Sequence, residues 1–234
     1  MNSLVWSGLA GLCTALGAFF LFLRKNWSNR DLAFFLGLAA GVMVAVVLFD
    51  MMPSALLFTG QVLALLGIAL GILLMIRVGI YLFQPASATN NLLNLGYLIM
   101  LGIALHDLPE GMAIAFGDAL KARTGMVIAL GIGIHNIPEG MAIAAPLIMG
   151  GMSRGDILLR TLLIGLITPL GTILGHCLVF YLPALLPFML GFASGIMIYL
   201  VVFQLMPQAR QYDRTSRWQG FWLGMLIIFL ATFM

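Results

Sequence analysis

Two polar hexapeptides lie within the most apolar part of this sequence. Residues 106–111 read HDLPEG and residues 135–140 read HNIPEG. Each begins with a histidine and places a glutamate four residues later, so both side chains point from the same face of a helix. Imidazole and carboxylate groups together are ligands of zinc and its first-row neighbours. The spacing therefore indicates a metal site to which two neighbouring helices contribute.

Six polar residues of the hexapeptides are the candidate metal ligands. They are His106, Asp107, Glu110, His135, Asn136 and Glu139. The residue after each histidine lies three positions from the glutamate of the same hexapeptide. A second ion beside the first would then share Glu110 and Glu139.

Acids at this depth in an apolar helix are costly. Each carboxylate near the bilayer centre costs roughly 2.5–3.5 kcal/mol, and no Lys or Arg lies near the centre of any predicted span. The acids must be protonated, face water or share a cation. Pro109 and Pro138 each lack an N–H, which frees the carbonyls of Leu105 and Ile134. The alternative to a metal site is a pair of proline-kinked helices whose polar groups bond to each other.

The composition excludes a soluble protein. The chain has 234 residues, of which 62% are hydrophobic and 8% charged, whereas soluble domains carry about 25% charged residues. A helix needs roughly 20 apolar residues to cross a bilayer. The first apolar stretch lacks a small-residue cleavage site, so we expect it to remain as a span. We predict one all-α integral membrane domain, 1–234, with eight spans at about 4–23, 32–51, 62–82, 93–117, 124–148, 157–181, 187–206 and 218–234.

The basic residues predict the orientation. With the N-terminus outside and alternating spans, nine of the eleven basic residues lie on the inner side, as the positive-inside rule requires. The outer pair is Lys121 and Arg123; the inner nine are Arg24, Lys25, Arg30, Arg77, Arg154, Arg160, Arg210, Arg214 and Arg217. We therefore expect a multi-pass protein of the cell membrane with both termini outside. The net charge of +3 needs no nucleic-acid partner.

The sequence contains internal repeats. Residues 102–117 match 131–146 at 10 of 16 positions, an offset of 29, and residues 37–55 match 191–209 at 9 of 19 positions, an offset of 154. The first three spans thus recur as the last three, with the fourth and fifth between them. In the predicted topology the copies are inverted, which is typical of transporters. The expected arrangement is 3+2+3.

With these motifs the chain resembles the ZIP (Zrt-, Irt-like) family of divalent metal transporters, bacterial type, along essentially its whole length. HDLPEGMAIAFG and HNIPEGMAIAAPL carry the resemblance. It implies a binuclear centre halfway across the membrane, formed by the six candidate ligands together with Met43 of the second span. It also implies a homodimer, and a block of spans 1, 4, 5 and 6 that slides against spans 2, 3, 7 and 8. Considered alone, Met43 would be an ordinary packing residue.

Two further residues, Thr168 and Asp50, bear on the predicted metal site and on its entrance. Members of this branch often carry a glutamate just before the proline of the sixth span, but ITPLG places Thr168 there. A bridging carboxylate is then missing, and the number of bound ions, one or two, stays open. Asp50, near the outer end of the second span, is expected to line the entrance and attract cations. Its alternative role is that of a hydrated side chain at the membrane interface.

The predicted function is transport of a divalent transition metal into the cytoplasm, with Zn²⁺ favoured. The direction comes only from the resemblance. The same ligands accept Cd²⁺, Mn²⁺, Fe²⁺ or Co²⁺, and no cofactor beyond the carried metal is expected. We do not expect an enzyme, because the hexapeptides match neither the H-E-x-x-H pattern of zinc proteases nor the Glu-x-x-His pattern of di-iron proteins. A proton-coupled carrier of an organic solute is the other alternative.

Overall fold

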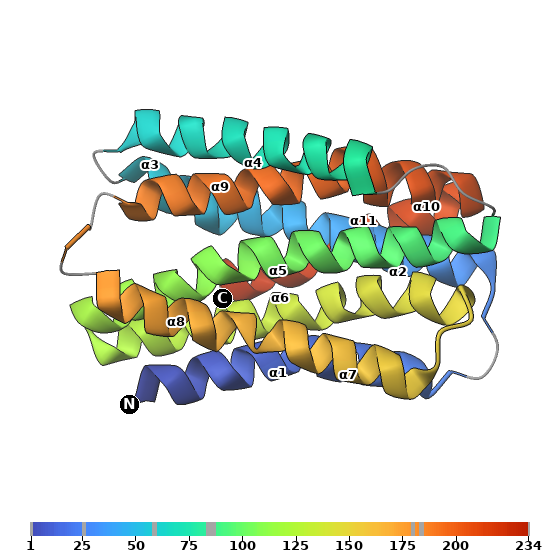
Figure 1. Ribbon diagram of the computed structural model, residues 1–234, viewed down its shortest axis with the longest axis horizontal. Helices are drawn as coiled ribbons and strands as arrows, with labels where there is room; N and C mark the ends of the chain where they lie inside the picture. The colour runs from blue at the N-terminus through green and yellow to red at the C-terminus, as the bar shows by residue number, and fades with distance from the viewer. Residues whose placement is uncertain are drawn as a thin grey trace.

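The computed structural model describes residues 2–24, 27–57, 60–82, 88–178, 181–182 and 185–233. Every regular element in these ranges is helical (Figure 1). In chain order the elements are α1 (Asn2–Phe22), α2 (Asn29–Val46), η1 (Val47–Met51), α3 (Met52–Leu57), α4 (Gln61–Leu82), α5 (Ala88–Leu120), α6 (Ala122–Met149), α7 (Arg154–Gly165), α8 (Ile167–Leu178), α9 (Leu185–Tyr199), η2 (Leu200–Leu205), α10 (Met206–Tyr212) and α11 (Arg214–Phe233).

Seven helical stretches in the described part of the chain are long and apolar enough to cross a membrane. They correspond to the first seven predicted spans and extend most of them by a few residues. The seventh continues to Tyr212, beyond the predicted end at residue 206. The eighth predicted span overlaps α11, but this helix does not belong to the seven. An eighth crossing therefore stays a prediction.

Three of these stretches change their helical geometry along their length. The second passes from α2 through η1, where the turns are π-helical, into α3, and the seventh passes from α9 through η2 into α10. A proline follows each π-helical segment, Pro53 and Pro207. Proline cannot donate a backbone hydrogen bond, and π-helical turns often occur at functional sites. The sixth stretch divides into α7 and α8 at Leu166.

The helices form two packed groups. In one group α6 packs against α1 and α5, and α8 packs against α5; in the other α2 packs along α11 and α4 along α9. Contacts of α5 with α9 and of α2 with α6 join the groups. In Figure 1, α1, α6, α7 and α8 fill the lower half and α4 and α9 the upper half, with α5 between them. The hexapeptides of α5 and α6 therefore lie where the two groups meet.

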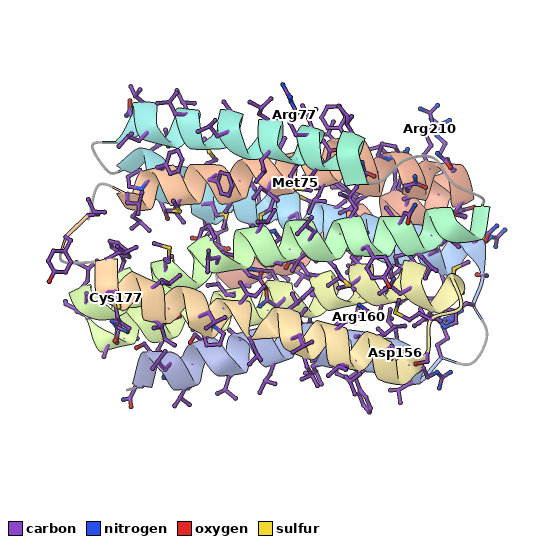
Figure 2. The ribbon with its side chains drawn as sticks, viewed as in Figure 1. Met75, Arg77, Asp156, Arg160, Cys177 and Arg210 are labelled. Carbon is purple, nitrogen blue, oxygen red and sulfur yellow. The ribbon has the colours of Figure 1, made fainter. Side chains whose placement is uncertain are left out.

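Basic residues gather at one end of the bundle, which we call the basic end. Figure 2 shows Asp156, Arg160 and Arg210 toward this end and Cys177 toward the other. The marks of both chain ends lie toward the end opposite the basic one (Figure 1). Lys25, which the sequence also assigns to the basic side, lies outside the described residues.

Polar caps begin the helices at the basic end. The Ser28 hydroxyl accepts from the Asp31 N–H at 3.3 Å before α2, and the Ser153 hydroxyl accepts from the Asp156 N–H at 3.2 Å before α7. The Ser216 N–H donates to Asp213 at 2.6 Å in the first turn of α11, which lowers the pKa of the Asp213 carboxyl. Such caps satisfy the free N–H groups at a helix start.

Close helix contacts at glycine hold α6 in place. A Cβ at Gly140, one residue after the second hexapeptide glutamate, would collide with the carbonyl oxygen of Thr14 in α1. A Cβ at Gly131, two turns earlier in the same helix, would meet nothing within 4 Å. Small residues allow backbones to approach in this way within a membrane.

We expect Gly140→Ala to destabilise the protein by about 1–3 kcal/mol, because it overpacks a backbone contact. Gly131→Ala is the matched control on the same helix and should cost nothing. Thermal unfolding of the purified protein in detergent compares the two variants. Equal melting temperatures for both would contradict the assigned contact between α1 and α6.

Candidate metal centre

The two hexapeptides occupy the middle of the two longest helices in the described chain. His106, Asp107 and Glu110 belong to α5, whereas His135 and Glu139 belong to α6. Both helices continue past their internal prolines, Pro109 and Pro138. All the candidate ligands in the hexapeptides are at most 3% exposed. The residues that the sequence singled out therefore meet inside the bundle.

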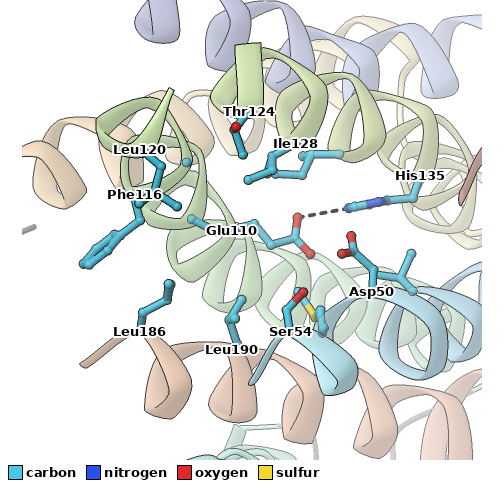
Figure 3. Close-up of a pocket in the computed structure, with 15 residues that line it drawn as sticks. Asp50, Ser54, Glu110, Phe116, Leu120, Thr124, Ile128, His135, Leu186 and Leu190 are labelled. Atoms are coloured by element: carbon cyan, nitrogen blue, oxygen red, sulfur yellow. Dashed lines mark hydrogen bonds and ion pairs between the residues drawn. The ribbon is translucent and has the colours of Figure 1, made fainter. Parts of the chain in front are cut away.

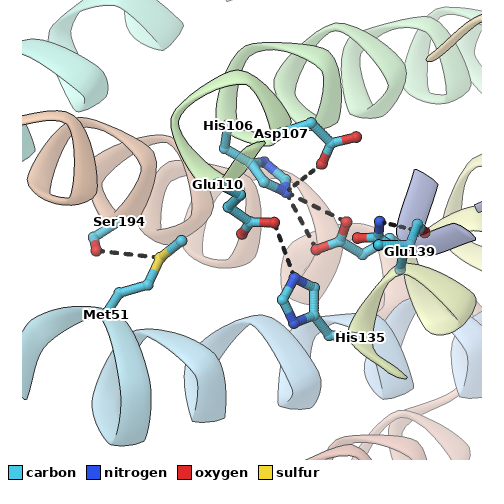
Figure 4. A network of polar contacts seen from close by, with 9 residues as sticks. Met51, His106, Asp107, Glu110, His135, Glu139 and Ser194 are labelled. Atoms are coloured by element: carbon cyan, nitrogen blue, oxygen red, sulfur yellow. Dashed lines mark hydrogen bonds and ion pairs between the residues drawn. The ribbon is translucent and has the colours of Figure 1, made fainter. Parts of the chain in front are cut away.

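One cluster joins His106 of α5 to Glu139 of α6. Nε2 of His106 lies 3.2 and 3.3 Å from the two carboxylate oxygens of Glu139, and 3.6 Å from Oδ1 of Asp107 (Figure 4). Each of these three residues offers one ligand atom, and the three atoms lie within 4.8 Å of one another. This spacing suits donors around a single cation.

A second pair makes the reciprocal connection. Nε2 of His135 in α6 lies 3.0 Å from Oε2 of Glu110 in α5, as Figure 4 also shows. The histidine of each helix thus faces the glutamate of the other helix, and not the glutamate four residues along its own. The four-residue spacing brings both side chains to one face, and the contact between the helices selects the partner.

Several polar atoms of these residues have no hydrogen-bond partner in the described part of the chain. They are Nδ1 of His106, both carboxylate oxygens of Asp107 and Oε1 of Glu110. A buried polar atom without a partner costs about 1–3 kcal/mol, and more when it is charged. With neutral imidazoles, the three carboxylates of Asp107, Glu110 and Glu139 carry three negative charges in one buried place. A divalent cation would both satisfy the free oxygens and offset this charge, so the donor set fits a metal ion.

Asn136 is oriented differently from the other candidates. Its Nδ2 donates to the carbonyl oxygen of Ala10 in α1 at 3.0 Å, and its Oδ1 is buried without a partner. The amide nitrogen therefore fastens α6 to α1. Asp107, at the matching position of α5, has two oxygens and no N–H to donate, so both oxygens stay available for a ligand.

A cavity of about 210 Å³ leads to the second pair from the end opposite the basic one. Glu110 and His135 line its inner part, and Leu120 and Thr124 line it where α5 ends and α6 begins. Figure 3 shows the Asp50 carboxylate in this cavity, directed toward Glu110 and His135. Asp50 thus lies beside the histidine–glutamate pair in the inner part of the cavity (Figure 3).

Met51 and Ser54 are among the cavity-wall residues that the sequence did not single out. Both line the cavity beside Asp50, and the Met51 sulfur accepts a hydrogen bond from Ser194 at 3.7 Å. The π-helical turn η1 presents Asp50 and Met51. The Met-Pro dipeptide that follows this turn is the local signal that could have indicated an irregular helix here.

Met43 and Thr168 lie near the centre without entering the cavity wall. Met43 is fully buried in the apolar core of the bundle, and it is absent from the cavity lining among the described residues. Thr168 is fully buried, and its hydroxyl oxygen has no partner. A Cβ at Gly111, next to Glu110, would collide with the Thr168 carbonyl, so Thr168 lies close to the first hexapeptide.

Comparisons with known proteins agree on one family. The sequence model of the ZIP zinc transporters matches residues 85–232. The zinc transporter ZupT of Escherichia fergusonii is 36% identical over 123 residues, which cover 47% of this chain and 48% of that protein. The ZupT proteins of Shigella dysenteriae serotype 1 and Escherichia coli K12 match with the same identity and coverage. The match spans about half the length of these curated relatives.

We expect His106→Ala and Glu139→Gln each to weaken Zn²⁺ binding by about tenfold or more, which corresponds to about 1.4 kcal/mol. His106→Ala removes an imidazole donor, and Glu139→Gln replaces a charged carboxylate with a neutral amide, which is a weaker ligand. His176→Ala is the control, because this histidine lies in α8 and contacts Ser3 at 2.9 Å. Isothermal titration of the purified protein measures the affinity. Unchanged affinity in the first two variants would exclude this cluster as the site.

Proposed function

Because the chain belongs to the ZIP zinc transporter family, we propose that it carries divalent transition-metal ions, with Zn²⁺ favoured, across the membrane into the cytoplasm. One observation carries the proposal. A buried cluster of imidazoles and carboxylates, with several oxygens that have no partner, lies at the inner end of a cavity that contains a further carboxylate. Relatives named as zinc transporters support the choice of ion.

The cavity is the proposed route of entry. Its volume of about 210 Å³ far exceeds the roughly 10–15 Å³ that one water requires, so a partly hydrated ion has room in it. Asp50 attracts the cation and raises its local concentration. Glu110 and His135 then replace part of its water shell, because their side chains line the inner end of the cavity.

The cluster of His106, Asp107 and Glu139 is the proposed next position of the ion. Glu139 is the partner of His106, and Glu110 is the partner of His135. An ion that moves between these pairs exchanges one imidazole–carboxylate pair for another of the same chemistry. The ligand nitrogens must be unprotonated, so binding releases any proton that an imidazole holds.

The ligand chemistry sets the class of ion. Nitrogen and oxygen donors suit Zn²⁺, and also accept Cd²⁺, Mn²⁺, Fe²⁺ or Co²⁺. Asp107 offers two oxygens without partners, which leaves capacity for a second ion beside the first. We propose one tightly held ion, since a threonine stands at position 168, where a carboxylate would bridge a second ion.

We also propose that α11 forms an eighth span. A Cβ at Gly220 or Gly224 would collide with the carbonyls of Phe34 and Leu38, so α11 lies against α2 along two successive turns. An eighth crossing places both termini on one side of the membrane. The gathering of arginines at the basic end supports an orientation with the termini outside. The homodimer and the 3+2+3 arrangement belong to the same proposal.

Uptake of Zn²⁺ into proteoliposomes tests the proposed transport. We expect His106→Ala and Glu139→Ala to lose most of the uptake that the unchanged protein supports, because each removes a donor from the route. His176→Ala is the matched control and should keep it. If all four proteins gave uptake equal to protein-free liposomes, or equal uptake to one another, the proposal would fail.

Thr168→Glu should strengthen binding of a second ion. The position is fully buried and adjoins the backbone beside Glu110, so a carboxylate there would add a donor and a negative charge. We expect the number of ions bound per chain to rise from about one to about two, since carboxylates bridge neighbouring metal ions. Anomalous diffraction of crystals soaked with Zn²⁺ counts the ions. Unchanged stoichiometry would contradict this role of position 168.

A further inference from the structure

Four arginines lie where α10 meets α11, beside the start of α2. The Arg217 side chain of α11 reaches α10, because its Nη1 donates to the Met206 carbonyl at 3.4 Å. Arg210 follows Met206 by four residues, and Arg214 precedes Arg217 by three; these spacings put side chains on one face of a helix. Arg30 lies in the first turn of α2, which packs against both α10 and α11. We call these four residues the arginine corner.

Little negative charge balances the arginine corner. No ion pair joins any of its four residues to an acid in the part of the chain that the structure describes. Asp31, next to Arg30, is bound by Arg24 at 2.7 Å. Asp213 accepts the Ser216 N–H at 2.6 Å, and this bond, with the charge of Arg30, lowers the pKa of its carboxyl. The corner therefore keeps a net positive charge, which suits an anionic ligand.

Arg217 has a buried donor without a partner. Only 8% of this residue is exposed, and its Nε has no hydrogen-bond partner among the described residues. Its Cζ lies 4.8 Å from the centre of the Trp218 ring, whose face attracts the guanidinium. A buried donor without a partner is costly, especially on a charged group, and arginine cannot lose its proton. Because a guanidinium can donate two parallel N–H bonds to phosphate oxygens, a phosphate group would satisfy this donor.

One face of α11 passes from charged to aromatic to aliphatic. Exposed side chains follow one another along it at intervals of four residues, and they are Arg214, Trp218, Trp222, Leu226 and Leu230. The rings of the two tryptophans stack, with centroids 6.4 Å apart. Exposed tryptophans of membrane proteins gather at the level of the lipid headgroups. A ligand on this face would therefore place an anionic group on the arginines and an apolar part along the leucines.

We propose that the arginine corner binds one anionic phospholipid, with its phosphate on Arg210, Arg214 and Arg217 and its acyl chains along α11. Figure 2 shows Arg210 reaching away from the bundle, where a headgroup has access to it. Basic pockets between membrane helices bind the headgroups of such lipids. A zwitterionic phospholipid carries the same phosphate with an ammonium group that the arginines repel, so net negative charge is selected. The site is separate from the metal centre, and it rests on the proposed crossing of the membrane by α11.

Native mass spectrometry of the purified protein tests the selectivity of the site. We expect one phosphatidylglycerol to bind roughly tenfold more tightly than phosphatidylcholine, and Arg214→Gln to weaken its binding about fivefold, or about 1 kcal/mol. Arg154→Gln is the matched control, because Arg154 is exposed and begins α7 as Arg214 begins α11, but Asp156 follows it in the first turn. Equal affinity for the two lipids, equal losses in the two variants, or displacement of the lipid by inorganic phosphate would overturn the proposal.

Lipids with brominated acyl chains test where the phospholipid lies, because bromine quenches the fluorescence of a tryptophan that it contacts. At equal mole fraction in vesicles, we expect brominated phosphatidylglycerol to quench more strongly than brominated phosphatidylcholine. Trp218→Phe with Trp222→Phe should abolish this difference. Trp6→Phe with Trp27→Phe, which removes the other two tryptophans of the chain, is the control and should keep it. No difference in the unchanged protein, or one that survives without Trp218 and Trp222, would overturn the assignment to α11.

Discussion

Buried negative charge is the constraint on which the rest of the structure depends. Asp107, Glu110 and Glu139 lie within apolar helices, and the ion pairs found for them in the described chain run only to histidines. An arginine or lysine in place of each histidine would neutralise the acids permanently. Imidazoles can release their protons and become ligands, so the cluster can exchange its internal contacts for contacts with a cation.

Close backbone contacts between helices position the side chains of the cluster. Glycines next to the glutamates allow α6 to touch α1 and α5 to touch α8. Thr172 in α8 adds a hydrogen bond to the Gly111 carbonyl at 2.9 Å. Because the contacts join backbone to backbone, they position the helices without large side chains that would fill the centre. The space left beside Glu110 is the cavity that contains Asp50.

The sequence predicted the elements well and the side-chain partners less well. Long apolar runs specify spans by length alone, and the histidine–glutamate spacing specifies a shared face, so the seven helices and the meeting of the hexapeptides could be predicted. Which glutamate faces His106 depends on the separation and rotation of two helices, which no local pattern encodes. Asn136 stays a predicted ligand: its Nδ2 donates to the Ala10 carbonyl of α1, and its Oδ1 has no partner among the described residues. Met51 became part of the cavity because a π-helical turn rotates the residues before Pro53.

The differences between the two halves are the part of the structure that can make the two sides of the site unequal. Perfectly equivalent halves would hold an ion equally from both sides, whereas unequal halves change how tightly each side holds it; the gradient decides the net direction in either case. By the repeat offsets, Asp50 corresponds to Gln204, Ser54 to Gln208, and Asp107 to Asn136. Two of these three differences put the carboxylate on one copy and the amide on the other. Because a dication responds to charge more strongly than to wall shape, the two differences in charge make the two copies unequal as surfaces for a dication.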